Sequence, residues 1–133
     1  MEGEIWMSLQ ASRGANATLF LGVVIAIWVA ARFSSVAVEK GANALPKVIM
    51  SLFAFSVFAI SWNLFTLVGN QWRGHAAAFQ GLKDSGVEIS ALAQGFIDQY
   101  AGEAMSAPNG IGILFLVTAL LIAVLPLWIK ATD

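Results

Sequence analysis

The sequence predicts an all-α integral membrane protein with three transmembrane helices and one short amphipathic extramembrane helix between the second and third. Two observations support this prediction. Of the 133 residues, 59% are hydrophobic and only 11% are charged, whereas soluble domains average about 25% charged residues. The charged residues are also unevenly placed, because three long windows contain none. A soluble domain this small could not cover its surface with so few charged side chains.

Each charge-free window is long enough to cross a bilayer. The windows cover residues 14–31, 48–72 and 104–129, and the first continues further if Arg32 snorkels to the headgroups. A bilayer core of about 30 Å needs about 20 helical residues. Backbone polar groups in lipid must bond internally, which favours helices, and membrane strands would be shorter and would alternate in polarity. We predict a single membrane domain over residues 1–133, with transmembrane helices at about 14–38, 47–72 and 108–130.

A cleaved signal peptide is the competing interpretation of the first window. A signal peptide begins with a basic segment, but here Glu2 and Glu4 precede the window and Arg13 is the one basic residue. Residues 42–44 resemble a cleavage site, yet charged residues separate them from the apolar stretch. We therefore expect the first window to be retained as a transmembrane helix.

The basic residues predict an orientation. Arg32, Lys40 and Lys47 lie in the loop after the first helix, and Arg73 and Lys83 lie in the loop after the second. Basic residues near helix ends prefer the cytoplasmic side. We expect the first loop and the C-terminus in the cytoplasm and the N-terminus outside. The short loops and the retained N-terminal helix favour the inner membrane of a bacterium.

The second loop is too long to be a bare connection. Ser85 and Glu88 match a capping box, and Gly102 is a plausible C-cap, so we predict an amphipathic helix at about 86–101. It carries no basic residue, unlike helices that lie on anionic membranes. Its apolar face is expected to dock on the chain's own helices or on a partner subunit. That face comprises Ile89, Leu92, Phe96 and Tyr100.

The first helix carries a row of small residues at every fourth position. Small residues let membrane helices approach closely, so the row predicts a packing seam, either within the chain or against another protein. The seam comprises Gly14, Thr18, Gly22, Ala26, Ala30 and Ser34.

The second helix carries a polar row within its window. An amide in hydrocarbon is costly unless it is hydrogen-bonded. We interpret Asn63 as the partner in an interhelical hydrogen bond; a contact with a substrate or ion is the alternative. The polar members of the row are Ser56, Asn63, Thr66 and Asn70, and the small Ala59 lies between the first two.

The chain offers little chemistry. No charged residue or histidine lies deep in a window, which argues against proton relays and coupled-ion sites. With no cysteine and one histidine, a single copy cannot build a thiolate or multi-histidine metal site. His75 could join haem or copper ligands from a partner, or it is simply solvated. Glu88, Asp98 and Glu103 lack the spacing of a calcium loop.

We therefore expect no catalytic, cofactor-binding or metal-binding residue in this chain, and no nucleic-acid partner, because the net charge is −1. The predicted function is a non-catalytic accessory subunit of a larger membrane complex, in contact with other membrane subunits and with lipids. A membrane oxidoreductase or monooxygenase is a candidate host, and the sequence does not select one. The alternative is a homo-oligomeric channel or carrier for small solutes, lined by the polar row of the second helix.

Overall fold

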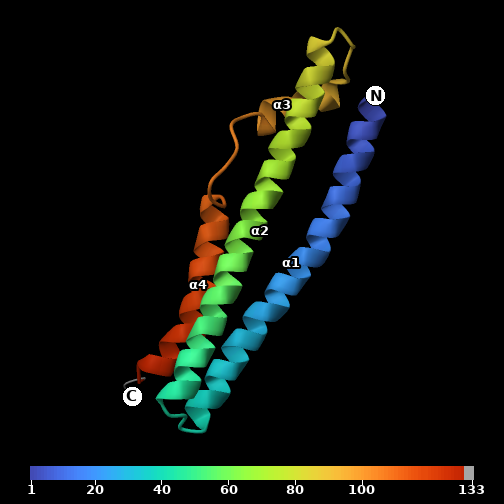
Figure 1. Cartoon of the computed structure of the whole chain (residues 1–133). Helices are drawn as coiled ribbons and strands as arrows, with labels where there is room; N and C mark the ends of the chain where they lie inside the picture. Colours follow the sequence, from blue (N-terminus) through green and yellow to red (C-terminus); the bar gives the residue numbers. More distant parts are fainter. Residues whose placement is uncertain (131–133) are drawn as a thin grey trace.

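The computed structural model describes residues 1–130. Within these residues the chain forms four helices, which are α1 (Glu2–Glu39), α2 (Ala44–Asp84), α3 (Ala91–Tyr100) and α4 (Gly110–Trp128). α1, α2 and α4 are each long and apolar enough to cross a membrane, so the predicted fold class is confirmed. The three long helices run side by side at one end of the molecule, and the short α3 lies near the other end, beside α2 (Figure 1).

α1 and α2 extend well beyond the spans predicted at 14–38 and 47–72. They contain 38 and 41 residues, which at 1.5 Å per residue gives about 57 and 62 Å, close to twice a bilayer core. The first charged residue marks where a helix can leave the lipid, and a helix does not have to end there. Residues 2–13 and 73–84 contain no proline, so both helices continue as one piece.

α4 has 19 residues, about 28 Å, which matches the bilayer core. At one end, the Trp128 indole donates a hydrogen bond to the Ser51 hydroxyl at 3.0 Å, and the Lys47 ammonium lies 5.9 Å from the centre of the Trp128 ring. At the other end, Gly112 lies against the Phe65 ring. The segment of α2 between Ser51 and Phe65 therefore lies at the depth of the hydrocarbon.

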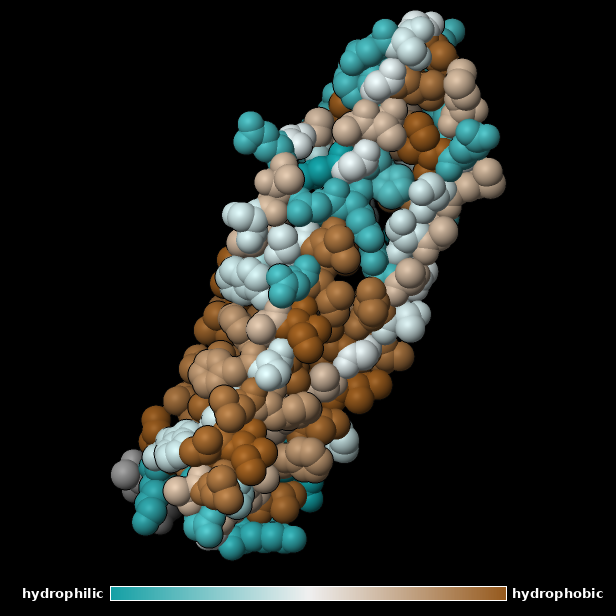
Figure 2. Space-filling view, viewed as in Figure 1, coloured by the Kyte–Doolittle hydropathy of each residue, from teal (hydrophilic) through white to brown (hydrophobic). Residues whose placement is uncertain are grey.

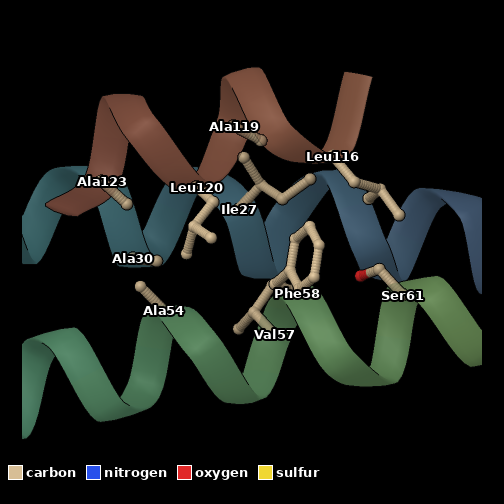
Figure 3. A pocket seen from close by; sticks show the side chains of 10 residues that line it. All are labelled: Ile27, Ala30, Ala54, Val57, Phe58, Ser61, Leu116, Ala119, Leu120 and Ala123. Atoms are coloured by element: carbon tan, nitrogen blue, oxygen red, sulfur yellow. The ribbon is translucent and has the colours of Figure 1, made fainter. Parts of the chain in front are cut away.

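Small residues bring the three spanning helices together. Ala30, Ala54 and Ala123 come from α1, α2 and α4, and they are 4%, 3% and 2% exposed. Ala30 and Ala54 point toward each other, and Ala123 points into the same contact (Figure 3). The gap that remains is about 10 Å³, room for no more than one water molecule. This part of the bundle is helix packing, with no space for a ligand.

Residues 2–13, residues 73–84 and α3 form a second packed unit, here called the head. Phe79 and Ala93 are fully buried, and Ile97 completes the cluster. The Trp6 ring from α1 lies 4.7 Å from the Phe79 ring and 5.7 Å from the Phe96 ring. Aromatic pairs at these distances add stabilisation beyond the area they bury. The predicted docking of the amphipathic helix occurs within the chain.

α3 begins later than the predicted residue 86, because Ser85 does not cap it. Ser85 is the residue after α2, and its hydroxyl donates a hydrogen bond to the carbonyl of Leu82. Gly86 has φ of +87°, a conformation that ends helices readily when the residue is glycine. The cap of α3 is Ser90, whose hydroxyl accepts a hydrogen bond from the Ala93 amide at 3.1 Å.

The late start of α3 also changes its buried face. Ala93 and Ile97 are the buried members, with Phe96 and Tyr100 half-buried beside them. Leu92, predicted on this face, is 71% exposed. The small Ala93 is the residue that lets α3 approach Phe79.

Candidate functional site

The small-residue row of α1 divides into two halves. Ala30 and Ser34 are buried in the bundle and Ala26 is half-buried. Gly14, Thr18 and Gly22 are exposed, and a Cβ atom at either glycine would meet nothing within 4 Å. Only the half near the C-terminal end of α1 therefore packs within the chain.

Helix geometry explains this division. Residues turn by about 100° each, so a spacing of four drifts by about 40° per step, and Ser34 lies about 200° around the helix from Gly14. A spacing of seven drifts only about 20° in the opposite sense. Four of the five buried residues of α1 are separated by multiples of seven: Leu9, Val23, Ala30 and Ala37. The fifth, Ser34, lies four residues after Ala30 on the adjoining face. Ala54 and Ser61 repeat it on α2, and Leu116 and Ala123 on α4.

The polar row of α2 also divides. Asn70 is half-buried, and its amide donates to the Met105 carbonyl at 3.0 Å and accepts from the Met105 amide at 2.6 Å. These two hydrogen bonds anchor the segment between α3 and α4 to α2. Thr66 donates to the carbonyl of Trp62, four residues before it, at 2.8 Å. Both residues have structural roles within the chain.

Ser56 and Asn63 face away from the bundle. Both are exposed. The Ser56 hydroxyl donates to the Leu52 carbonyl of its own helix. The Asn63 amide takes part in none of the hydrogen bonds formed among residues 1–130. Asn63 lies between Ser51 and Phe65, at the depth of the hydrocarbon. The interhelical hydrogen bond predicted for it is not formed within this chain.

His75 is tied to the protein rather than simply solvated. Its Nδ1 lies 2.7 Å from the Gln71 carbonyl and its Nε2 lies 3.3 Å from the Ser8 hydroxyl. The Nδ1–H therefore donates to the Gln71 carbonyl, and Nε2 shares a hydrogen bond with the Ser8 hydroxyl. Through Ser8 the ring links α1 to α2. Over residues 1–130, no three histidine, aspartate or glutamate side chains gather as a metal site would require.

The acidic residues of the second loop are dispersed. Glu88, Asp98 and Glu103 are all exposed. The Asp98 carboxylate accepts a hydrogen bond from Gln94, one turn earlier in α3, at 2.8 Å. We find no arrangement here that pairs two carboxylates for acid–base work.

A groove of about 880 Å³ lies between α1, α2, the start of α4 and the segment before it. α1 diverges from the other two helices along this length (Figure 1), and the surface is hollowed between α1 and the body of the molecule (Figure 2). The Asn16 amide reaches across to the Gln71 side chain at 2.8 Å. Arg13 and Arg73 lie on the groove wall, and the rest of the lining is mostly apolar or aromatic.

No family model, curated protein or solved structure matches this chain. The candidate sites therefore rest on the chain's own residues.

Sequence reasoning did not find the groove. Its lining comes from four separate segments, and pairing of residues this distant has no local pattern. One signal was present: Arg13 and Arg73 are the charged residues at which the windows of α1 and α2 end. Because those helices run in opposite directions, both arginines belong at the same membrane boundary.

Proposed function

We propose that this chain is a non-catalytic accessory subunit of a larger membrane complex, held there by contacts between transmembrane helices. The observation that supports the proposal most directly is Asn63. Its amide faces outward at hydrocarbon depth with no partner in the described chain. An unbonded amide in lipid is costly, and hydrogen bonds between membrane helices satisfy such groups. A neighbouring helix from another subunit would supply the missing partner.

The outward half of the α1 row supports the same proposal. Gly14, Thr18 and Gly22 present a smooth surface with open space above both glycines. In a membrane, surfaces of this kind permit close approach of a second helix. The chain thus offers two separate outward faces, one on α1 and one on α2, which suits a subunit that touches more than one neighbour.

The alternative is a homo-oligomeric channel or carrier lined by the polar row of α2. Three of the four polar residues are already bonded within the chain, since Asn70 holds Met105, and Ser56 and Thr66 each donate to a carbonyl of their own helix. Only the Asn63 side chain of this row remains unbonded among the described residues to face a lumen. We therefore rank the channel second.

The size of the assembly in mild detergent distinguishes these proposals. Asn63→Leu is expected to weaken association about 3- to 30-fold, the equivalent of one interhelical hydrogen bond, and to leave the melting temperature of the separated chain unchanged. Asn70→Ala should do the reverse and lower the melting temperature, because it leaves both polar groups of the Met105 backbone unpaired.

Thr118→Leu is the matched control, since Thr118 is also polar and exposed but lies on α4. It should change neither the assembly nor the melting temperature. The accessory role is supported if other subunits co-purify with the wild type and are lost from the Asn63→Leu variant. An assembly made only of copies of this chain supports the channel. An assembly that Asn63→Leu leaves intact contradicts both.

For localisation, we propose the inner membrane of a bacterium, with the head outside and the C-terminus in the cytoplasm. Arg32, Lys40, Lys47 and Lys130 lie on the proposed cytoplasmic side, against Arg13, Arg73 and Lys83 on the other. The excess of basic residues supports this orientation.

A further inference from the structure

The groove has two zones with different chemistry. The part farther from the head is aromatic, because the Phe65 ring lies 6.0 Å from the Phe20 ring and 6.1 Å from the Phe115 ring. The part nearer the head carries the two arginines, together with Trp72 and Tyr100. The volume of about 880 Å³ lies in the range of pockets that hold small molecules, about 300–1,000 Å³. The groove therefore suits a ligand with a long apolar part and a polar end.

The charge of the groove has one sign. Arg13 and Arg73 are the charged residues of its described lining, which contains no carboxylate. This segregation is notable because the chain has more acidic than basic residues, 8 against 7. The acidic residues at this end of the molecule lie elsewhere, in the head and the second loop. The polar end of the ligand is therefore expected to be an anion.

Arg73 is positioned for such a contact. One of its terminal nitrogens donates to the Glu103 carbonyl, which ties the side chain to the segment before α4. A guanidinium has five N–H donors, so several remain for a ligand after this bond. Planar guanidinium groups match the geometry of phosphate oxygens.

The groove opens toward the membrane rather than only toward water. Ile111 and Leu19, on its rim, are 81% and 44% exposed, and both belong to transmembrane helices. Arg13 and Arg73 stand at the boundary where the charge-free segments of α1 and α2 end, the level at which lipid headgroups lie.

We propose that the groove binds one anionic phospholipid, with its phosphate between Arg13 and Arg73 and an acyl chain along the Phe20, Phe65 and Phe115 rings. A zwitterionic phospholipid carries its own cation beside the phosphate and therefore balances the two guanidiniums less well, and an apolar protein helix supplies no counter-charge at all. The site does not depend on the accessory role. Arg13 and Phe20, which line the groove, lie on the far side of α1 from Gly22, about 180° and 160° around the helix, so this side of the groove stays open when the small-residue face is occupied.

The test uses the full chain, reconstituted in nanodiscs with equal amounts of phosphatidylglycerol and phosphatidylcholine. Native mass spectrometry then counts the lipids that stay bound to the chain after the chain is released from the nanodisc. We expect one phosphatidylglycerol per chain, retained about tenfold or more over phosphatidylcholine, as one charge-assisted contact would give. Arg13→Gln should remove most of this preference, and Arg13→Gln with Arg73→Gln should remove it entirely.

Two matched controls separate the site from general effects. Lys83→Gln removes the same charge at the same end of the molecule but outside the groove, and it should leave the preference unchanged. Ala17→Trp fills the groove without changing charge and should abolish retention, whereas Ala15→Trp, on the opposite side of α1, should not. If Arg73→Gln fails to fold, Arg13→Gln and Ala17→Trp decide the question by themselves.

Three results would overturn the proposal. One is equal retention of the two lipids by the wild type. Another is retention that Arg13→Gln or Ala17→Trp leaves unchanged. The third is a different occupant, a quinone or a segment of another polypeptide, found cross-linked to a photoreactive residue at position 17 in membranes.

Discussion

Two asparagines of α2 show how position decides the role of a residue. Asn63 and Asn70 are seven residues apart and so lie near the same side of a straight helix. Asn70 lies where the chain returns from α3 and holds the Met105 backbone from both sides. Asn63 lies about 10 Å deeper in the membrane, and there its side chain is exposed and faces away from the other described helices. The same amide is a structural anchor at one level and an unsatisfied group at the other.

Glu2 joins the start of α1 to the start of α3. The Ser90 hydroxyl donates to its carboxylate at 2.6 Å, the Trp6 indole at 3.0 Å and the Ser90 amide at 2.9 Å. These donors, the Ser90 hydroxyl foremost, hold the pKa of Glu2 below its ordinary value. The contribution to stability is then fully present above the ordinary pKa of 4.5 and is lost as the pH falls through the lowered pKa of the folded chain.

Acidification is therefore expected to loosen the head. Spin labels on cysteines introduced at Gly3 and Leu92, both exposed, would report the distance between α1 and α3. The distribution of these distances should become broader as the pH falls below 4.5. In Glu2→Gln the distribution should already be broad at neutral pH and should no longer depend on pH. Glu4→Gln is the control, and a loss of pH dependence in that variant would contradict the assignment to Glu2.

At the scale of elements, the head depends on one buried ring. Phe79 is fully buried and touches Trp6 of α1 and Phe96 of α3. Phe79 thus connects α1, α2 and α3 through residues that lie far apart in the sequence. Its removal leaves a cavity that neighbouring side chains on separate helices cannot fill.

Phe79→Ala is expected to cost about 3–5 kcal/mol, the usual range for a buried phenylalanine, and to release α3 from the two long helices. Limited proteolysis of the chain in detergent should then cut between residues 85 and 109, where the wild type resists. Leu92→Ala, which changes an exposed side chain of α3, should behave as the wild type does. Equal resistance of both variants would show that α3 is held by other contacts.

The helices also show how much of the fold can be predicted from the sequence alone. Charge-free windows predicted the three spans, and the spacing of apolar residues predicted α3, because both are local patterns. The lengths of α1 and α2 were missed, since charge marks the edge of lipid and carries no information on the end of a helix. The groove and the Asn70–Met105 anchor were missed because they rest on contacts between distant segments. The division of the α1 row could have been predicted, because a four-residue spacing cannot stay on one face.

At the scale of the whole molecule, the two ends differ in kind. The N-terminus, α3 and the second loop gather at one end, whereas residues 40–43 and the end of α4 lie at the other (Figure 1). The membrane therefore separates a structured head from a compact turn. Because the chain has no cysteine of its own, single introduced cysteines can report the side on which each end lies.

Cysteines at Ser85 or Ser106 are expected to react with a membrane-impermeant maleimide in intact cells, if the head lies outside as we propose from the distribution of basic residues. A cysteine at Asn43 should react only after lysis. All three positions are exposed in the structure, so protection reports the membrane and not burial in the chain. Labelling of Asn43→Cys in intact cells, with protection of the other two, would place the head in the cytoplasm. The groove would then draw its phospholipid from the inner leaflet, since its arginines lie at the head end whichever way the chain is inserted.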